Sequence, residues 1–460
     1  MWRPLRRNRG ITAVTLVVGA LICGGASAAV ALGQSHGQGH SHGRGHAHHR
    51  GHAGERGGTR AALSCGAQVT SSVTLTADIG PCPPSSDGID IVASDVKVNL
   101  DGHSITGTNS TNNTTSEPVG IMLMNVHNVR VTGPGTIQNF DAGMAVNGGS
   151  DNTIRRLTAR NNVAHVLFSG GVDPANPVKT PCDYGDGITT DNSNNNLIDH
   201  VVATGNGPFD GIALVDASNN NKILHSKSYN NNVPQIIQNG PSAGQNGPCG
   251  PFQANGPGPG RPHQDIGIRI EGPGATHNIV AANRSIGNEL EGISIHANIC
   301  PNNPAGAPAG APNTDNLVAN NQVLSNGFAG PTEHLDGIGV LSQGPAGVVC
   351  IAYNNAIVGN TSSYNANDGI FLGGRGSTGN SVLRNRANYN GKDGIELSGP
   401  TPPSTRVPNG LPGTINTVVR GNEAHGNAVY DAADGNPTCD NNTWRDNRFT
   451  TFNPSCVMGG

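Results

Sequence analysis

A short alternating pattern recurs from residue 87 onward: a glycine, an apolar residue, a variable residue and, in most copies, a second apolar residue. Copies begin at Gly88, Gly120, Gly143, Gly187, Gly211, Gly267, Gly292, Gly337, Gly369 and Gly394. The shortest spacings between copies are 23, 24 and 25 residues. The alternation predicts a short β-strand with one buried face. Its return at such a period indicates a solenoid, in which each repeat contributes one coil.

Asparagine forms a second periodic signature, with three positions that lie five residues apart in each unit. The clearest units contain Asn278, Asn283 and Asn288; Asn316, Asn321 and Asn326; and Asn355, Asn360 and Asn365. The unit that ends at Asn427 instead has Thr417 at the first position. Asparagine tolerates the left-handed backbone region and bonds to nearby backbone groups, so we expect it at the corners of the coil. Stacked asparagines are then expected to form amide ladders.

Only short β-prone segments separate these corners, and no apolar pattern of period 3.6 is sustained after the N-terminal segment. The composition agrees, since Gly numbers 67 and Pro 31 while aromatic residues are only 3% of the chain. Each unit has room for three short strands, which would pair with the equivalent strands of the neighbouring coils. The predicted fold is all-β: a single-stranded right-handed parallel β-helix of about ten or more coils, with disulfide-containing ends.

These units resemble the parallel β-helix repeats of exported carbohydrate-active proteins, of the pectate-lyase-like, carbohydrate-binding and sugar-hydrolase type, over residues 87–447. The Cys-Gly-Ala segment at 65–67 and the Leu-Asp-Gly-His-Ser-Ile-Thr-Gly segment at 100–107 are similar to the start of many such bacterial proteins. The segment 434–456, with Trp444 between Cys439 and Cys456, resembles their C-terminal cap. The resemblance implies the fold and a polysaccharide as partner. It does not specify the chemistry, because the same coil serves lyases, hydrolases, epimerases, adhesins and tailspikes.

The first residues have the pattern of an export signal, in which four arginines precede an apolar run and the Ala-Ser-Ala segment at 26–28 offers a cleavage site. The alternative is a retained membrane anchor, because the apolar run continues to Ala31. We expect a signal peptide at 1–31, a disordered linker at 32–60 and an N-terminal cap at 61–86. The repeats are expected at 87–427 and a C-terminal cap at 428–460. The mature protein would be secreted and free of the membrane.

The linker is rich in Gly and His and has no apolar period, so it cannot bury a core. The linker contains seven histidines: His36, His40, His42, His46, His48, His49 and His52. Neutral imidazole binds Zn, Cu and Ni ions, which makes these residues candidate metal ligands. The alternative is a flexible spacer.

Eight cysteines follow the signal, an even number that suits an oxidised exported protein. They are Cys65, Cys82, Cys182, Cys249, Cys300, Cys350, Cys439 and Cys456. The sequence leaves the connectivity open. Because contacts in a solenoid are local along the chain, pairing of sequential neighbours is favoured.

The charge distribution argues against a nucleic-acid partner. Residues 1–60 carry eight Arg, no Lys and one acidic residue, which leaves 19 basic and 30 acidic residues in 61–460. A net charge of −11 on the folded part is unsuited to non-specific binding of DNA or RNA.

Candidate chemistry comes from the alternation of the Gly-Ile strands. If Ile268 and Ile270 point into the bore, then Arg269 and Glu271 point outward, and His296 lies beside them on the next coil. His296 could act as a base, Arg269 could bind a uronate carboxylate, and Glu271 could orient or donate a proton. His263 and Asp265 would lie at the edge of the same coil. The alternative is that these outward groups are solvated and that Arg269 and Glu271 form a plain ion pair.

The chain lacks the sequence motifs of particular enzymes with this fold. It has neither the Asp-Asp pair nor the Gly-His-Gly segment that polygalacturonases carry, and it has only part of the Asp-Pro-His motif of alginate epimerases. Aspartates that precede Gly recur too regularly for one active site and are interpreted as turn residues. Calcium is an option on the acidic face, where Asp183, Asp186 and Asp191 are the nearest grouping.

Three functions stay open. The first is a secreted protein that binds or modifies an extracellular polysaccharide, as a lyase, an epimerase or a glycoside hydrolase. The second is a non-catalytic surface or binding protein, and the third is a copper-handling accessory protein, supported only by the His-rich linker. A monomer is expected in each case.

Overall fold

The chain divides into two units, Met1–Gly54 and Glu55–Gly460. The computed structural model describes residues 58–108, 118–163, 185–207, 209–231, 266–272, 274–297, 312–328, 335–342, 351–374, 377–400 and 413–458, all in the second unit. His263, Asp265, the seven histidines of the linker and Cys182, Cys249, Cys300 and Cys350 lie outside the described residues, as does Asp183.

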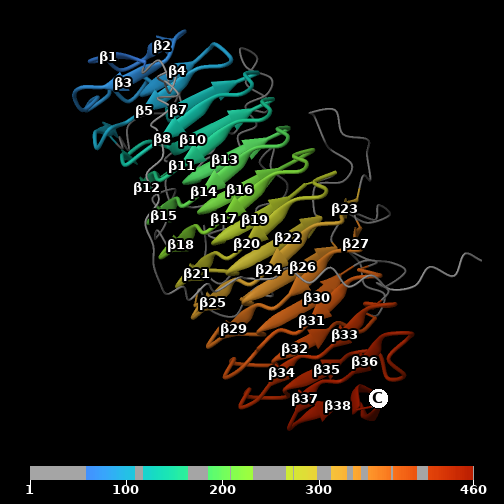
Figure 1. Ribbon diagram of the computed structural model, residues 1–460. Coiled ribbons are helices and arrows are strands. Elements are labelled where there is room, and N and C mark those ends of the chain that lie inside the picture. Colours follow the sequence, from blue (N-terminus) through green and yellow to red (C-terminus); the bar gives the residue numbers. More distant parts are fainter. Residues whose placement is uncertain are drawn as a thin grey trace, which may run out of the picture. The chain divides into compact units, whose positions relative to one another are not determined.

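Three long parallel sheets build the described part of the second unit, and each successive coil adds a strand to sheets A and B and, in eight coils, to sheet C (Figure 1). Sheet A contains, in spatial order, β1 (Thr59–Ala61), β3 (Val73–Leu75), β5 (Lys97–Asn99), β8 (Arg130–Thr132), β11 (Thr153–Arg155), β14 (Leu197–Asp199), β17 (Lys222–Leu224), β20 (Ile279–Ala281), β24 (Leu317–Ala319), β28 (Ala356–Val358), β31 (Ser381–Leu383), β33 (Val418–Arg420) and β36 (Thr443–Arg445).

Sheet B carries the Gly-Ile strands of the repeat. It contains β2 (Ala67–Val69), β4 (Ile89–Ile91), β7 (Val119–Met124), β10 (Ala142–Asn147), β13 (Ile188–Asp191), β16 (Ile212–Val215), β19 (Ile268–Glu271), β22 (Ile293–Ala297), β26 (Ile338–Ser342), β30 (Ile370–Gly374), β32 (Ile395–Leu397), β35 (Ala432–Asp434) and β38 (Phe452–Asn453).

Sheet C is shorter. It contains β6 (Ser104–Thr106), β9 (Thr136–Gln138), β12 (Thr158–Arg160), β15 (Val202–Thr204), β18 (Lys227–Tyr229), β21 (Arg284–Ile286), β25 (Gln322–Leu324) and β29 (Thr361–Ser363). Two small pairs complete the described strands: β23 (Asn313–Thr314) with β27 (Ala352–Tyr353), and β34 (Glu423–Ala424) with β37 (Arg448–Phe449). One 3-10 turn, η1 (Ser455–Met458), follows.

The chain passes through the sheets in the order A, C, B and then enters the next coil, so the predicted right-handed parallel β-helix is confirmed. Its interior is a column of stacked apolar side chains. In sheet B one isoleucine lies directly over the next in seven successive strands: Ile188, Ile212, Ile268, Ile293, Ile338, Ile370 and Ile395. All seven are fully buried. Ile268 and Ile270 both belong to the apolar core, so the parity predicted from the sequence is correct.

The asparagine ladders are present at the corners and are almost fully buried. At the corner before sheet C, Asn283 Nδ2 donates to Asn321 Oδ1 (3.1 Å), and Asn321 Nδ2 donates to Asn360 Oδ1 (2.9 Å). The same Asn321 amide also bonds the backbone, because its Oδ1 accepts from Asn283 N and its Nδ2 donates to Val280 O. Every hydrogen-bonding group of such a side chain is thereby satisfied.

The structure corrects one detail of this prediction. The residues with positive φ are those directly before the ladder asparagines, such as Ala282 (φ 57°) and Asn320 (φ 55°), and not Asn283 and Asn321 themselves. The asparagine is required for its amide, whereas the residue before it makes the turn. Many residue types occupy that position, because its side chain takes no part in the ladder.

The repeated glycine is required by the same ladders. A Cβ atom on Gly337 would lie 2.4 Å from Asn365 Nδ2, and a Cβ atom on Gly369 would lie 2.5 Å from Asn390 Nδ2. Such distances are shorter than van der Waals contact allows. The Gly-Ile and asparagine signatures therefore describe two sides of one packing contact.

Aspartates before the glycines accept hydrogen bonds from the backbone of the next coil, as their interpretation as turn residues implies. Asp186 Oδ1 accepts from Asp210 N (2.6 Å), and Asp336 Oδ1 accepts from Asp368 N (3.0 Å). Asp368 in turn accepts from Asp393 N (2.9 Å). These carboxylates help to hold neighbouring coils in register.

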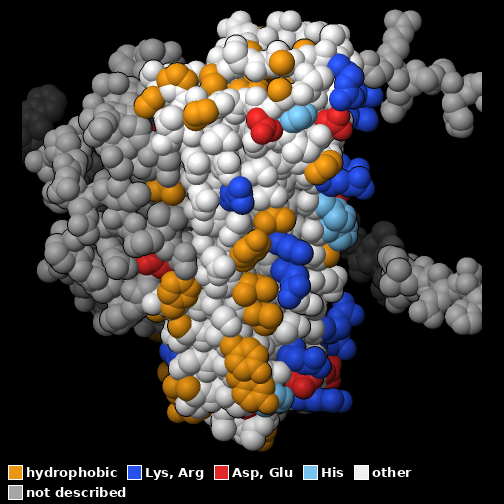
Figure 2. Space-filling view, turned by 90° about the vertical axis from the view of Figure 1, so that its left-hand side faces the viewer, with side chains coloured by type: hydrophobic (Ala, Val, Ile, Leu, Met, Phe, Trp, Pro, Cys, Tyr) orange, Lys and Arg blue, Asp and Glu red, His pale blue; other side chains and the backbone are white. Residues whose placement is uncertain are grey.

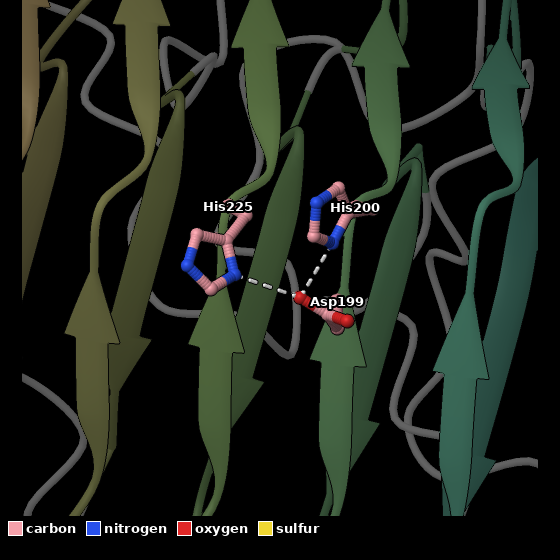
Figure 3. Close-up of side chains that lie close together, drawn as sticks. All are labelled: Asp199, His200 and His225. Carbon is pink, nitrogen blue, oxygen red and sulfur yellow. Dashed lines mark hydrogen bonds and ion pairs between the residues drawn. The ribbon is translucent and has the colours of Figure 1, made fainter. Parts of the chain in front are cut away.

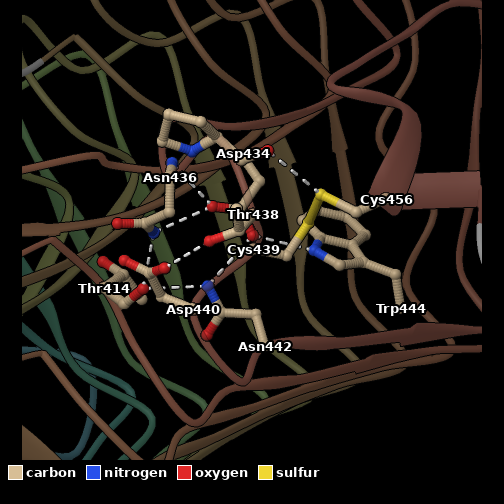
Figure 4. Close-up of a disulfide and its surroundings, with 10 residues drawn as sticks. Thr414, Asp434, Asn436, Thr438, Cys439, Asp440, Asn442, Trp444 and Cys456 are labelled. Atoms are coloured by element: carbon tan, nitrogen blue, oxygen red, sulfur yellow. Dashed lines mark hydrogen bonds between the residues drawn. A yellow bond between two sulfur atoms is a disulfide. The ribbon is translucent and has the colours of Figure 1, made fainter.

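Disulfides close both ends of the described coils. Cys65 is joined to Cys82 and Cys439 to Cys456, the pairings that the sequence favours for the two ends. At the C-terminal end the disulfide lies beside Trp444, whose Nε1 donates to Asp434 Oδ2 (3.0 Å) (Figure 4). Asn442 Nδ2 donates to the same oxygen and Asn436 Nδ2 to Asp434 Oδ1.

Substitution of Asn321 by alanine tests the ladder. The change removes the acceptor of Asn283 N–H and Asn283 Nδ2–H and the side-chain donor to Val280 O, and each buried group left unpaired costs about 1–3 kcal/mol. We expect a loss of about 3–5 kcal/mol in the free energy of unfolding, measured by denaturant titration. The control Gln322→Ala changes an exposed neighbour and should shift stability by less than about 0.5 kcal/mol. Equal effects of the two variants would contradict a structural role of the ladder.

Candidate functional site

The outer face of sheet B brings together the charged residues that the strand alternation selected. Arg269 and Glu271 lie on β19, and in the parallel pairing they stand opposite Ser294 and His296 of β22. Arg269 Nη2 donates to Glu271 Oε1 at 2.6 Å and lies 3.1 Å from His296 Nδ1. The three residues therefore form one hydrogen-bonded group across two coils.

A further carboxylate, Asp210, extends this group from the start of β16. Its Oδ2 lies 3.7 Å from Arg269 Nη1. Burial raises the pKa of Asp210 well above its ordinary value, although the positive charge of Arg269 opposes this shift. For Arg269, burial lowers the pKa, but the negative charges of Glu271 and Asp210 outweigh burial and hold the pKa of the guanidinium above its usual value.

Glu291, like Asp210, is a residue of this site that was not predicted from the sequence. It precedes Gly292, in the position that aspartate holds in most repeats, and its side chain lies over Gly339 of the next strand, where a Cβ atom would meet Glu291 Oε1 at 2.5 Å. Burial raises the pKa of Glu291 to about 7, against the opposing effects of the Ser294 hydroxyl and the charge of Arg269. A glutamate before a repeat glycine, where aspartate is usual, is the signal that could have identified it.

Burial distinguishes this site from an ordinary solvated surface. Arg269 is 1% exposed, Glu271 and His296 are each 8% exposed, and Glu291 is 1% exposed. The alternative of solvated outward side chains is therefore wrong for this part of sheet B. Neighbouring outward positions are buried as well, and burial raises the pKa of Asp216 to about 6, with a further contribution from Glu271.

This arrangement is suited to proton transfer. A carboxyl group with a pKa near 7 can donate a proton at neutral pH, and an imidazole held by a neighbouring hydrogen bond can accept one. The guanidinium of Arg269 is occupied by Glu271, with Asp210 close by, so it orients these groups instead of offering an unpaired cation to a uronate.

A second charged grouping lies further along the same sheet, where Asp368, Asp393 and Glu396 bring three carboxylates within 4.8 Å of one another. The Lys392 ammonium forms ion pairs with all three and lies 5.9 Å from the centre of the Phe371 ring. Burial raises the pKa of Asp368 to about 10, helped by the nearby Asp336 and Glu396. The single positive charge of Lys392 thus already offsets part of the negative charge of these carboxylates.

The grouping proposed for calcium is engaged in other contacts where the structure describes it. Asp186 bonds the backbone of Asp210, and Asp191 Oδ1 accepts from Asn192 Nδ2. Calcium binding therefore stays a prediction from the sequence, as does metal binding by the linker histidines.

Exposed aromatic rings form a third feature, at the corner between sheets C and B. Tyr364 (59% exposed) and Tyr389 (49% exposed) stack with ring centres 5.3 Å apart and an interplanar angle of 13°. His425 meets Tyr389 edge-on at 5.0 Å. The view of the sheet C side shows hydrophobic and basic side chains next to one another along the coils (Figure 2). This stack was not predicted from the sequence, although Tyr364 and Tyr389 lie 25 positions apart, each directly before a ladder asparagine.

Known structures support the fold. The chain is similar to the Dettilon tailspike protein, with a TM-score of 0.51 at 17% identity over 84% of this chain and 59% of the tailspike. Weaker matches are the periplasmic alginate epimerase AlgG (TM-score 0.37, 15% identity, 70% of this chain and 64% of that chain) and the catalytic domain of GH87 α-1,3-glucanase in complex with nigerose (TM-score 0.45, 11% identity, 85% and 63%).

The likeness to the tailspike defines the class of protein: a right-handed parallel β-helix. The chain spans only 59% of the tailspike's length, and the two weaker matches add no argument about this chain. No protein family and no curated protein matches the sequence. Across the described coils, no helix has the length and hydrophobicity that a membrane crossing requires.

The environment of Glu291 has a measurable consequence for stability. Its folded pKa of about 7 exceeds the ordinary value of 4.5, so its contribution to stability is complete below pH 4.5 and is lost as the pH rises through 7. Between pH 4.5 and 7 we expect the free energy of unfolding of the parent chain to fall by about 1.4 kcal/mol per pH unit relative to that of Glu291→Gln. The non-ionisable control Gln322→Ala should keep a constant difference from the parent, and a constant difference for Glu291→Gln would contradict the raised pKa.

Proposed function

We propose that the chain is an exported protein that binds an extracellular polysaccharide and modifies it by acid–base chemistry on the outer face of β19 and β22. The observation that supports this proposal is the buried group of Arg269, Glu271 and His296 beside Glu291, whose pKa is near neutral. A purely structural coil has no need of such a group, because the apolar column and the asparagine ladders already hold the coils together.

Each residue has a distinct role in the proposal. Glu291 is the general acid, since burial keeps it protonated up to about pH 7. His296 is the general base. Arg269 positions both Glu271 and His296 through its guanidinium, and Glu271 keeps that guanidinium in place. Groups held in this way need little rearrangement during the reaction.

Export is supported by the disulfides, which form in an oxidising compartment. Two disulfides occur in the described coils, and disulfides persist outside the cytoplasm. The arginine-rich start, apolar run and Ala-Ser-Ala segment of the N-terminal sequence agree with export. A polysaccharide as the partner follows from the resemblance of the repeats to those of carbohydrate-active proteins.

Activity assays test the catalytic proposal. We expect the purified chain to act on at least one member of a panel of neutral glycans and polyuronates, detected as reducing ends, unsaturated product or epimerised sugar. Glu291→Gln and His296→Gln should each lower the rate about 100-fold or more, because a general acid or base contributes about that much. The control Lys227→Gln changes an exposed residue of sheet C and should leave the rate unchanged.

Two results would overturn the catalytic proposal. One is the absence of any product across the panel. The other is full activity in Glu291→Gln and His296→Gln when their circular dichroism and unfolding match those of the parent chain.

Non-catalytic binding of polysaccharide is the second candidate, and the tyrosine stack favours it. Tyrosine offers a large apolar face with a polar edge, which suits contact with the faces and hydroxyls of sugar rings. Tyr364 and Tyr389 stack on each other on adjacent coils, and the parts of their rings outside the stack are exposed. An exposed apolar surface of this kind commonly marks a binding site.

Tyrosine substitutions separate binding from catalysis. Tyr364→Ala and Tyr389→Ala should each weaken polysaccharide binding about tenfold in affinity electrophoresis, since each removes roughly 1–1.5 kcal/mol of ring contact. Tyr353→Ala is the matched control, because Tyr353 is an exposed tyrosine on β27. Unchanged binding in the two stack variants would exclude this surface.

A further inference from the structure

Two histidines and an aspartate form a separate cluster on the outer side of sheet A and its corner toward sheet C. Asp199 ends β14, His200 follows it at the corner, and His225 holds the same corner position one coil later (Figure 3). His200 Nδ1 lies 2.8 Å and His225 Nδ1 lies 3.0 Å from Asp199 Oδ1. The two rings face each other with centres 4.9 Å apart.

The backbone explains why both imidazoles point away from the coil. His200 (φ 55°) and His225 (φ 49°) occupy the left-handed corner position that precedes Val201 and Ser226. Side chains at this position lie outside the bore, and those of adjacent coils lie side by side. The corresponding residues of the neighbouring coils are Arg156 and Ala282, so this corner carries just two successive imidazoles.

Asp199 is held in place from its other side. Its Oδ2 accepts from Arg155 Nε (2.9 Å) and Nη2 (2.7 Å), so Oδ1 is directed at the two histidines. The carboxylate is therefore preoriented, while the imidazoles are accessible, with about half of each side chain exposed (55% and 53%).

We infer that Asp199, His200 and His225 form a binding site for a divalent cation of the zinc class. One ligand atom from each residue lies within 4.8 Å of the other two. In a tetrahedral zinc site with bonds of about 2.0–2.1 Å, neighbouring ligand atoms lie about 3.3 Å apart. The distances of 2.8 and 3.0 Å between Asp199 Oδ1 and the two Nδ1 atoms are close to that value. These two distances need to lengthen by only a few tenths of an ångström.

The ion lies between Asp199 Oδ1 and the two Nδ1 atoms, each imidazole binds it as the neutral tautomer with its proton on Nε2, and water completes the coordination. Two imidazoles and one carboxylate suit Zn²⁺, Cu²⁺ or Ni²⁺ better than Ca²⁺ or Mg²⁺, which prefer oxygen ligands. Arg155 stays on Oδ2, where it orients the ligand carboxylate. This site is independent of the Arg269 group, which lies on sheet B.

Zinc titration of the full chain tests this site, once the linker histidines no longer contribute. The parent for the experiment is therefore a full-length chain in which His36, His40, His42, His46, His48, His49 and His52 are changed to serine. We expect it to bind one Zn²⁺ per chain in competition with a chromophoric chelator. His200→Ala, His225→Ala and Asp199→Asn should each weaken this step at least about tenfold. Co²⁺ should give an absorption spectrum of nitrogen and oxygen ligation that the same variants lose.

His277→Ala is the matched control, because His277 is also exposed, also has a left-handed backbone (φ 57°) and also lies near a carboxylate, Asp315 at 3.8 Å. It should keep the zinc affinity of the parent. The inference is overturned if the parent binds no zinc, if the three site variants bind as tightly as the parent, or if His277→Ala loses binding to the same degree. Matching unfolding midpoints of the zinc-free variants will show that the fold is retained.

Discussion

The buried asparagine amide is the constraint on which this structure depends. A solenoid corner turns the backbone away from its strand pairing, and the freed groups are buried between coils, where an unpaired hydrogen-bonding group is costly. Each ladder amide bonds both the next amide and the backbone, as Asn321 does with Asn360 and Val280. The ladder stops where the residue type changes: at Thr417, the amide of Asn380 turns to Ser377 instead. The regular spacing of the repeats follows from this pairing.

Corners held in this way leave other positions free to vary. The residue before each ladder asparagine makes the turn with its backbone, and its side chain is displayed outside the coil in register with that of the next coil. Pairs of like residues on adjacent coils therefore become pairs of neighbouring side chains. The stacked Tyr364 and Tyr389 and the imidazoles of His200 and His225 both arise from this geometry.

The candidate acid–base site was predictable in part. Strand alternation and the parallel register were sufficient to bring Arg269, Glu271 and His296 together, because both are regular features of the repeat. Glu291 was not recognised, since only the aspartates before the repeat glycines were considered, and those were interpreted as turn residues. Burial was not predictable either, because outward residues of a solenoid are usually solvated, and it is burial that raises the pKa of Glu291 toward neutrality.

The sequence by itself determined the coil: its period, its three corners, its apolar bore and the inward or outward parity of each strand. These properties are local and repeated, so each copy reinforces the same interpretation. Only the tertiary structure decided which outward groups meet, which carboxylates lose water and which histidines share an aspartate. Such properties depend on contacts between coils, where residues 25 or more positions apart lie within hydrogen-bonding distance. The distance between two such side chains is set by the stacking of coils and is not encoded in either residue alone.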